Sequence, residues 1–333
     1  MANGVAVLGA GSWGTTVAAL LTPVVPTVLW SRRTELADDL NAGKGNDRYL
    51  PGVDLPRNLV ATADLDEAVS NADLVLVAVP TVGFRAALEA SSTALGAGVP
   101  VVSLAKGFER GSLLRMTEVV AEVLPGRPVA VLTGPNLAKE VLEGRSSAAV
   151  VAATDQEVAE TLQGLLASER FRIYTNEDLV GCEIGGAVKN VIALAAGMAE
   201  GLETGDNARA ALITRGLAEL TRLGEALGGE VRTLAGLAGM GDMLATCISP
   251  LSRNRWVGEQ IGRGRAPAEV LAGMDQVAEG VHAAGVVCEL ASRTSVEVPI
   301  ADGVRAVVED DRRPVEVWAE LMARQPGPEV AGP

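Results

Sequence analysis

The chain is poor in the residues that mark metal sites, disulfide frameworks and aromatic cores. Its 333 residues include one histidine and three cysteines, and 3% of them are aromatic. Cys182, Cys247 and Cys288 are widely spaced, odd in number and without a CxxC pair, so we expect three reduced thiols and no metal site. The core should instead consist of Ala, Val, Leu and Gly on closely packed helices and strands, which is typical of an α/β protein.

Positive charge is also scarce. The chain has 28 Lys and Arg against 42 Asp and Glu, a net charge of −14, and no basic block. This balance disfavours nucleic acid and anionic membrane surfaces as partners. An anionic substrate would need a local cluster of Lys and Arg, which is feasible because charges more than about 8 Å apart are largely screened at physiological salt.

Targeting and membrane-spanning segments are not evident in the sequence. The N-terminal segment has no basic region and leads from Val5 directly into a glycine-rich turn at Gly9, so we expect no signal peptide. No apolar run is expected to approach the ~18 residues of a membrane span. These features predict a cytoplasmic protein without membrane insertion.

Short runs rich in Val and Leu recur through the first half of the chain. They lack polar alternation, which predicts strands that are buried on both faces. Helix-compatible stretches lie between most of them, such as Trp13–Leu21 and Phe84–Ser91. Strands that alternate with helices predict a parallel, doubly wound sheet. The expected strands are Val5–Leu8, Thr27–Trp30, Leu59–Thr62, Leu74–Val79, Val99–Leu104, Val129–Leu132 and Ala148–Ala152.

The pattern changes near residue 176, after which no strand-like run follows. The polar segment Thr175–Asp178 could cap a long helix. We expect an α/β domain at residues 1–177, an all-helical domain at 178–324 and a disordered tail at 325–333, which carries three prolines and two glycines. The expected helices of the second domain are Leu179–Gly201, Ala208–Leu227, Arg253–Gly262, Val281–Thr294 and Ile300–Val308.

A GxGxxG segment, Gly9–Gly14, follows the first expected strand and opens the first expected helix. This context is the one that a dinucleotide-binding turn requires. Gly9 permits the tight turn, Gly11 lets the backbone approach a pyrophosphate, and Gly14 allows close helix–strand packing. A glycine turn in another kind of α/β protein is the alternative.

Two arginines, Arg32 and Arg33, follow the second expected strand. An NAD-selective site usually carries Asp or Glu here to bind the ribose 2′-hydroxyl. The arginines could instead bind a 2′-phosphate, so NADPH should bind at least as well as NADH. Two solvated loop arginines are the alternative.

Seven motifs occur in order along the chain: Gly9–Gly14, Ala105–Gly107, Gly134–Glu140, Gly185–Asn190, Ala211–Gly216, Gly239–Asp242 and Ser252–Arg255. They resemble the motifs of the bacterial NAD(P)-dependent glycerol-3-phosphate dehydrogenases. The resemblance implies a Rossmann-type N-terminal domain, a helical C-terminal domain and an active site in the cleft between them. It implies reduction of dihydroxyacetone phosphate to sn-glycerol 3-phosphate by NADPH or NADH, which would supply phospholipid synthesis.

The resemblance also implies roles for individual residues. Lys189 is similar to the family's catalytic lysine, and Lys106 and Asp242 to its neighbours in the site. The implied contacts to the phosphorylated triose are Lys106, Gly134, Asn136, Lys189, Asn190, Asp242, Ser252, Arg253 and Asn254. The implied cofactor positions are Gly9, Gly11, Ser12, Trp13, Gly14, Arg32, Arg33, Lys106, Ala138, Arg253, Val277 and Glu279.

Reduction of a ketone needs a positioned acid, because negative charge develops on the carbonyl oxygen. The one histidine, His282, lies in an expected helix away from every motif. Lys189 interrupts the apolar stretch Gly185–Met198, where lysine is normally excluded. Burial and Lys106 would disfavour its charged form, whereas Asp242 would favour that form and orient it. A lysine that snorkels from the helix to water is the alternative.

Three further charged residues have local reasons to lie in a site. Lys106 follows an apolar run, which places it at the carboxyl end of a parallel strand, where ligands bind; a solvated loop lysine is the alternative. Arg253 lies near the start of an expected helix, whose first amides could share a phosphate with it. Asp242 follows the turn Gly239–Gly241, expected to be flexible, and could equally be a helix N-cap.

Two other functions remain open from the sequence. A related two-domain hydroxy-acid dehydrogenase is one, although the run Ser252–Arg255 favours a small phosphorylated triose. A non-catalytic NADP-binding sensor is the other, and the retention of Lys106, Lys189 and Asp242 argues against it. The apolar helical half also leaves a homodimer open.

Overall fold

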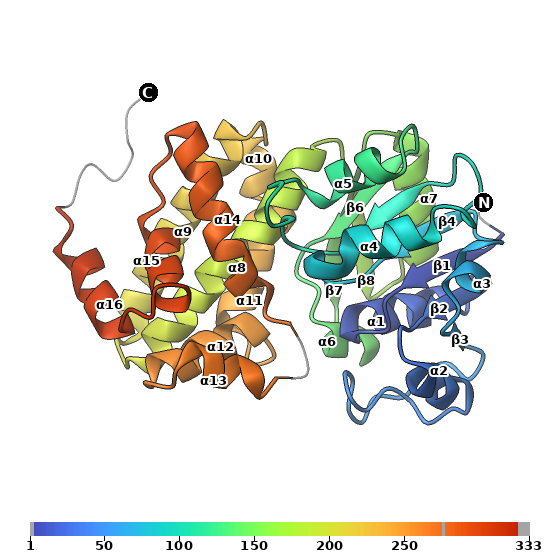
Figure 1. Cartoon of the computed structure of the whole chain (residues 1–333), viewed down its shortest axis with the longest axis horizontal. Helices are drawn as coiled ribbons and strands as arrows, with labels where there is room; N and C mark the ends of the chain where they lie inside the picture. The colour runs from blue at the N-terminus through green and yellow to red at the C-terminus, as the bar shows by residue number, and fades with distance from the viewer. Residues whose placement is uncertain (1–2, 275–276, 326–333) are drawn as a thin grey trace.

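The computed structural model describes residues 3–274 and 277–325. An α/β region and a helical region lie side by side along the long axis of the molecule (Figure 1). The disordered tail expected at 325–333 lies outside the described residues apart from Gln325. The expected boundary between two domains at 177 and 178 stays a prediction, and the two halves are called regions below.

The α/β region contains one eight-stranded sheet with the order β3-β2-β1-β4-β5-β6-β7-β8. All neighbouring strands are parallel except β6 and β7, which are antiparallel. The expectation of a doubly wound α/β fold is confirmed. The strands are β1 (Val5–Leu8), β2 (Thr27–Trp30), β3 (Val60–Thr62), β4 (Leu74–Val77), β5 (Val101–Ser103), β6 (Val129–Thr133), β7 (Ser147–Ala153) and β8 (Phe171–Asn176).

Two features of the sheet differ from the expectation. The eighth strand, Phe171–Asn176, was not predicted, because its first four residues alternate between buried and exposed as an edge strand does. The search for continuous apolar runs finds only strands that are covered on both faces. The purely parallel arrangement was also wrong at β6 and β7, because a buried apolar run does not indicate the direction of a strand.

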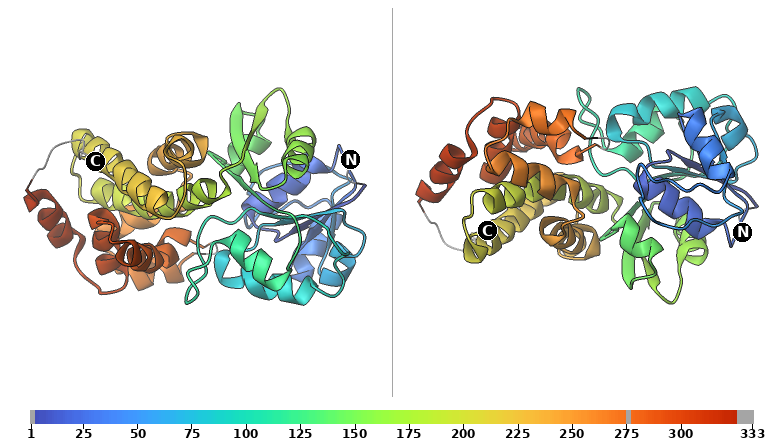
Figure 2. Two further views of the ribbon diagram at one scale, coloured as in Figure 1. Left: turned by 90° about the horizontal axis from the view of Figure 1, so that it is seen from above. Right: turned by 90° about the horizontal axis from the view of Figure 1, so that it is seen from below.

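Helices cover both faces of the sheet (Figure 2). Successive strand residues point to opposite faces, so Val7 and Leu76 pack with α1, α2 and α7, whereas Leu8 and Val77 pack with α3, α4 and α5. The carboxyl ends of the parallel strands therefore remain available at one edge. The helices are α1 (Ser12–Leu21), α2 (Thr34–Asn41), α3 (Leu65–Val69), α4 (Thr81–Ser91), α5 (Met116–Val123), α6 (Ala138–Leu142) and α7 (Gln156–Leu166).

The helical region is built around α8. Asp178 caps this helix as expected and accepts a hydrogen bond from the backbone N–H of Gly181 at 2.7 Å. The elements are α8 (Leu179–Gly201), α9 (Asp206–Ala226), α10 (Val231–Leu234), the π-helical turn η1 (Leu237–Gly241), α11 (Asp242–Ile248), α12 (Arg253–Gly262), α13 (Pro267–Ala272), α14 (Glu279–Thr294), α15 (Pro299–Val308) and α16 (Pro314–Ala323).

Glycines allow α8 and α12 to touch backbone to backbone. A Cβ atom on Gly197 would lie 2.0 Å from the carbonyl oxygen of Arg255, and one on Gly258 would lie 2.1 Å from that of Leu194. Both helices have the predicted bounds. The short helices α10, α13 and α16 were not predicted, and α9 begins two residues earlier than expected, with Gly205 as its N-cap.

The expectation that no apolar run reaches membrane length was wrong for α8. This helix is long and apolar enough to span a bilayer, with a mean hydropathy of 1.5, as is one bent pair, Val231–Ile248 with Arg253–Gly262. However, 89% of the apolar window of α8 is buried inside the protein. Its apolar character is explained by its place at the centre of the helical region.

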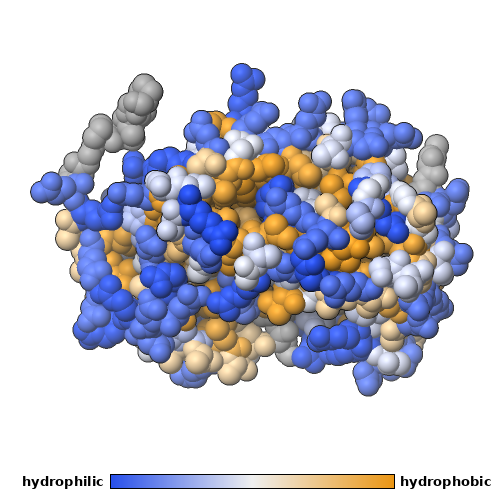
Figure 3. Space-filling view, turned by 45° about the horizontal axis from the view of Figure 1, so that its top comes forward, coloured by the Kyte–Doolittle hydropathy of each residue, from blue (hydrophilic) through white to orange (hydrophobic). Residues whose placement is uncertain are grey.

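On the face shown in Figure 3, hydrophobic side chains gather across the middle, with hydrophilic ones around the rim.

Candidate active site

The glycine-rich turn leaves the start of α1 open. Gly9 has φ +113°, and a Cβ atom on Gly14 would lie 1.9 Å from the carbonyl oxygen of Gly9. A Cβ atom on Gly11 would meet nothing within 4 Å. The N-cap of α1 makes no side-chain hydrogen bond, so the first amides of the helix can meet the pyrophosphate of a dinucleotide.

The other positions expected on the cofactor side lie at the start of α1, at the start of α6 and before α14. Ser12 and Trp13 open α1 and are half-buried. The buried indole N–H of Trp13 has no hydrogen-bond partner within residues 3–274 and 277–325. Ala138 is the first residue of α6, and Val277 lies two residues before α14 and is half-buried. The structure has no ligand, so their contacts to a cofactor stay predictions.

Arg32 and Arg33 lie in the loop between β2 and α2. Arg32 is exposed, and the guanidinium of Arg33 lies 5.4 Å from the centre of the Tyr49 ring. Neither arginine forms an ion pair within the part of the chain that the structure describes. Two unneutralised guanidinium groups therefore lie next to the turn that suits a dinucleotide.

Three charged side chains meet at the boundary between the two regions. Lys106 follows β5, Lys189 lies in the middle of α8, and Asp242 is the first residue of α11. The Nζ of Lys106 donates to Oδ2 of Asp242 at 2.6 Å, and the Nζ of Lys189 donates to Oδ1 at 2.8 Å. One carboxylate therefore joins two ammonium groups, which we call the lysine pair.

The cluster is nearly dry. Lys189 is 6% exposed and Asp242 is 2% exposed. Burial lowers the pKa of Lys106 to about 8, with a further lowering from Lys189 and Arg253, while Asp242 opposes the shift. Burial would raise the pKa of Asp242, but Lys106 and Lys189 outweigh it, so that pKa lies below its ordinary value. The two cations therefore keep the carboxylate ionised.

The structure decides between several alternatives left open by the sequence. Lys189 does not snorkel to water and Lys106 is not a solvated loop residue, because both donate to Asp242. Asp242 is not an N-cap, since α11 has Gly241 in that position. The turn before it was expected to be flexible, but it is a packed π-helical turn, in which a Cβ atom on Gly239 would lie 2.0 Å from the carbonyl oxygen of Leu234.

Thr246 belongs to the cluster and was missed from the sequence. The Nζ of Lys189 donates to its Oγ1 at 2.6 Å, and that hydroxyl donates to the carbonyl oxygen of Asp242, also at 2.6 Å. Residues four apart share one face of a helix, so the spacing from Asp242 was a signal for Thr246.

A row of amides links the cluster to the start of α12. Asn190 donates to the carbonyl oxygens of Lys106 at 3.0 Å and Gly186 at 3.2 Å. Asn254 donates to Oδ1 of Asn190 at 2.9 Å, and its own Oδ1 accepts from the backbone N–H of Gly280 at 3.0 Å. Both N–H groups of Asn190 are thus engaged by the protein, and its contact to substrate stays a prediction.

Arg253 opens α12, where Ser252 is the N-cap and accepts from the backbone N–H of Arg255 at 3.2 Å. The side chain of Arg253 is exposed, yet desolvation by the surrounding protein lowers its pKa, with Glu279 opposing the shift. A side chain that is exposed to water and also desolvated by surrounding protein atoms lies in a surface depression. Such a depression with a guanidinium group suits the binding of an anion.

Polar atoms without partners lie near the end of β6. Both side-chain polar atoms of Asn136 are buried and have no hydrogen-bond partner among the residues that the structure describes, and the same holds for the hydroxyl of Thr133. Gly134, between them, has φ +110°, and its carbonyl oxygen accepts from Lys106 at 2.8 Å. Buried polar groups are almost always hydrogen-bonded, so this unsatisfied set fits a polar ligand next to the lysine pair.

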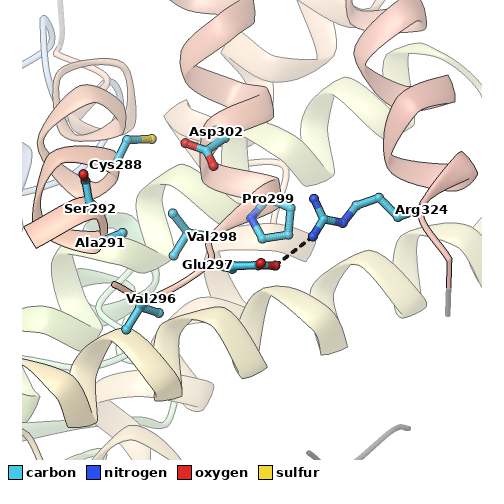
Figure 4. A pocket seen from close by; sticks show the side chains of 9 residues that line it. All are labelled: Cys288, Ala291, Ser292, Val296, Glu297, Val298, Pro299, Asp302 and Arg324. Carbon is cyan, nitrogen blue, oxygen red and sulfur yellow. Dashed lines mark hydrogen bonds and ion pairs between the residues drawn. The ribbon is translucent and has the colours of Figure 1, made fainter. Parts of the chain in front are cut away.

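A separate cavity of about 270 Å³ lies in the helical region, between α14, α15 and the end of α16 (Figure 4). Its lining includes Cys288, Asp302 and an ion pair between Glu297 and Arg324 at 2.9 Å. None of the residues expected in the active site lines it.

Comparison with known proteins covers both regions. Residues 4–159 match the family model of the NAD-dependent glycerol-3-phosphate dehydrogenase N-terminus, and residues 178–319 match that of its C-terminus. The chain is 50% identical over 326 residues to glycerol-3-phosphate dehydrogenase (NAD(P)+) 2 of Sphingopyxis alaskensis, covering 98% of each. It is 51% identical over 332 residues to glycerol-3-phosphate dehydrogenase (NAD(P)+) of Thermobifida fusca, covering 98% of this chain and 99% of that protein.

A solved structure agrees. The crystal structure of glycerol-3-phosphate dehydrogenase from Coxiella burnetii superposes with a TM-score of 0.93 at 37% identity, over 97% of this chain and 99% of that one. The likeness thus extends through both regions and the boundary where the lysine pair lies. The chain belongs to the NAD-dependent glycerol-3-phosphate dehydrogenase family.

Proposed function

We propose that this chain reduces dihydroxyacetone phosphate to sn-glycerol 3-phosphate with NADPH or NADH, and that it catalyses the reverse reaction. Family membership supports the reaction. The observation that carries the mechanism is the lysine pair: two ammonium groups joined by the single carboxylate of Asp242. The cluster keeps one excess positive charge in a dry site, and such a charge stabilises a carbonyl oxygen that becomes negative.

Counting donors shows how the lysine pair meets a substrate. An ammonium group has three N–H bonds. Lys189 uses two of them, on Asp242 and Thr246, and Lys106 uses two, on Asp242 and the carbonyl oxygen of Gly134. Each lysine therefore retains one donor, and both can serve the same carbonyl oxygen.

Lys189 is proposed as the general acid. It is the more deeply buried lysine, and its two hydrogen bonds fix the direction of the third N–H. It gives a proton to the substrate oxygen as the carbon is reduced, and it takes that proton back in the oxidation of the alcohol. Lys106 keeps its proton and stabilises the charge on the same oxygen.

The cofactor is proposed to lie along the turn Gly9–Gly14, with its pyrophosphate on the amides of α1. When bound, it supplies the hydride. Arg32 and Arg33 would bind a 2′-phosphate through charge-assisted hydrogen bonds, so NADPH should bind at least as well as NADH. Ala138, Val277 and Glu279 are proposed to complete this side.

The substrate phosphate is proposed to bind at the start of α12. Arg253 and the first amides of that helix offer charge and donors together, and Ser252, Asn254 and Asn190 surround them. Gly134 and Asn136 are proposed to contact the triose itself. Binding of the phosphate, remote from the reacting carbon, holds the ketone in place for reaction.

We further propose a cytoplasmic role in supplying glycerol 3-phosphate for phospholipid synthesis, and a homodimer. An exposed apolar face of the helical region supports the dimer. Met240, Leu244 and Ile248 are four residues apart and 39%, 39% and 68% exposed. Light scattering of the wild type and of Ile248→Asp tests the dimer, and two monomeric samples would contradict it.

The experiment that tests the proposed function is the initial rate of NADPH oxidation with dihydroxyacetone phosphate, repeated with unphosphorylated dihydroxyacetone and with NADH. We expect rapid oxidation that depends on the phosphate. Folded protein that binds NADPH but turns over neither substrate would favour the sensor. Equal rates with both ketones would contradict a triose phosphate as the substrate.

A further inference from the structure

Three carboxylates of the helical region accept hydrogen bonds from the α/β region. Glu279 accepts from the backbone N–H of Thr81 at 3.2 Å and from its hydroxyl at 2.8 Å, at the start of α4. Glu183 holds the start of α5 in the same manner. Glu309 accepts from Arg110 at 3.0 Å, nearer the surface. The first amides of α4 and α5 are therefore occupied by side chains of the helical region, whereas those of α1 are not.

Glu183 is the most deeply buried of the three, at 7% exposure. Its Oε1 accepts from the backbone N–H of Thr117 at 2.9 Å. Its Oε2 accepts from the guanidinium of Arg115 at 2.6 Å and from the hydroxyl of Thr117 at 2.6 Å. Burial raises the pKa of Glu183, and Arg115 opposes the shift. None of the three hydrogen bonds involves a residue proposed to react.

The segment that Glu183 holds begins at Lys106. Residues 106–115 make up most of the connection from the end of β5 at Ser103 to the start of α5 at Met116. The near end is fixed by Asn190, which donates to the carbonyl oxygen of Lys106 at 3.0 Å. Phe108 and Leu113, both less than 7% exposed, are buried in the hydrophobic core of the helical region. The far end is fixed by Glu183.

The two residues that fix the ends of this segment, Asn190 and Glu183, both lie on α8, the helix that carries Lys189. Asn190 follows Lys189 directly, and Glu183 precedes it by six residues on α8. The segment 106–115 is therefore hydrogen-bonded to α8 at each end, although it follows strand β5 of the sheet in sequence. The separation of the two lysines is set by α8 and not by the sheet alone.

We propose that Glu183 is a positioning residue, which fixes Lys106 relative to Lys189 by holding the start of α5 against α8. The inference rests on the proposed reaction, in which both lysines serve one oxygen. When an amide replaces the carboxylate, one of the two acceptor oxygens becomes a donor group, so Arg115 and Thr117 cannot keep all three hydrogen bonds and the far end of the segment is loosened. A displacement of about 1 Å in a catalytic group can lower a rate about 100-fold.

The pH profile separates positioning from a purely structural role. Burial, with Lys189 and Arg253, lowers the pKa of Lys106 from 10.5 to about 8, and Asp242 opposes this. In the wild type, ketone reduction should therefore decline above pH ~8, as Lys106 loses its proton. When the segment loosens, the effects of burial, Lys189, Arg253 and Asp242 on Lys106 all weaken. The pKa of Lys106 then returns toward its ordinary value, and the decline in rate moves to higher pH.

The test compares Glu183→Gln with Glu219→Gln. Glu219 is a matched control because it is 3% exposed and also caps a helix from a neighbouring one, accepting from the backbone N–H groups of Ile300 at 2.8 Å and Ala301 at 3.3 Å. Both variants should have a lower Tm. Only Glu183→Gln should lower kcat, by about tenfold or more, and move the alkaline decline upward, with KM for NADPH unchanged.

A second variant and a second readout keep the test decisive. Thr117→Val removes only one hydroxyl, so it serves where Glu183→Gln does not fold, and it should shift kcat and pH profile less in the same direction. The pH dependence of Lys106 acylation by acetic anhydride, followed by mass spectrometry, reports the pKa of Lys106 without turnover. Unchanged kcat, pH profile and acylation in the folded variants would overturn the proposal. An inactive wild type would instead overturn the proposed reaction, and acylation would still decide the positioning.

Discussion

The α/β region and the helical region offer a ligand two different kinds of surface. The proposed cofactor side consists mostly of backbone: a turn whose glycines leave room, and the uncapped amides of α1. The proposed substrate side consists of side chains that are buried and paired, with Asp242 between two lysines. A backbone surface tolerates changes of side chain as long as space remains, whereas a paired charge cluster depends on every member.

The largest effect should come from removing the shared member of the cluster. Asp242→Asn leaves two buried ammonium groups without a counter-charge, and breaking a buried ion pair in this way costs about 3–5 kcal/mol of folding stability. We expect nearly complete loss of turnover together with a lower free energy of unfolding, measured by denaturant titration. A variant with wild-type stability and rate would show that the ion pairs of Asp242 contribute neither to folding nor to turnover.

Arg253→Ala should affect the substrate more than the cofactor, because the substrate phosphate is proposed to bind this guanidinium directly. A charge-assisted hydrogen bond is worth about 1.5–3 kcal/mol, so KM for dihydroxyacetone phosphate should rise roughly 10- to 150-fold. The rate with unphosphorylated dihydroxyacetone should not change. An unaltered KM for the phosphorylated substrate would place the phosphate elsewhere.

Gly11→Ala should produce the opposite signature. Apart from its chain neighbours, the added methyl group meets no atom of the described residues within 4 Å, so folding is unaffected, but it enters the space where the pyrophosphate is proposed to approach. We expect KM for NADPH to rise about tenfold, which corresponds to about 1.4 kcal/mol. Gly164→Ala in α7 is the control, because its methyl group also meets nothing. Equal KM values for the two variants would argue against a cofactor at this turn.

The smallest effect should come from the two arginines that follow β2, of which Arg32 is exposed and Arg33 is half-buried. Replacing Arg32 and Arg33 by Ala should weaken NADPH binding a few-fold, because charges in contact with water are screened by water and salt. NADH lacks the 2′-phosphate and should bind equally well to both proteins. A parallel loss for both cofactors in isothermal titration calorimetry would contradict the assignment of these arginines to the 2′-phosphate.

The same difference between the regions explains what the sequence could predict. The turn at Gly9–Gly14 lies within one strand–helix unit, so its glycine spacing indicates both structure and role. Residue patterns also predicted the bounds of α8 and α12 and the burial of Lys189. The edge strand β8 was missed because its buried and exposed residues alternate.

The contacts of the substrate side join distant parts of the chain. Lys106, Lys189 and Asp242 are separated by more than 50 residues at each step, and only their resemblance to family motifs brought them together before the structure was known. Glu183 and Thr81 carried no signal of their partners, because a carboxylate that caps a helix of another region leaves no local pattern. Thr246 alone could have been found, from its spacing to Asp242.

The central claim is that the acid lies in the helical region and is separable from the cofactor surface. Lys189→Ala tests it most directly, when NADPH oxidation with dihydroxyacetone phosphate and NADPH affinity are measured on the same sample. We expect kcat to fall about 100- to 10,000-fold, the usual contribution of a general acid, with NADPH affinity unchanged. Near-normal turnover in this variant would contradict the account.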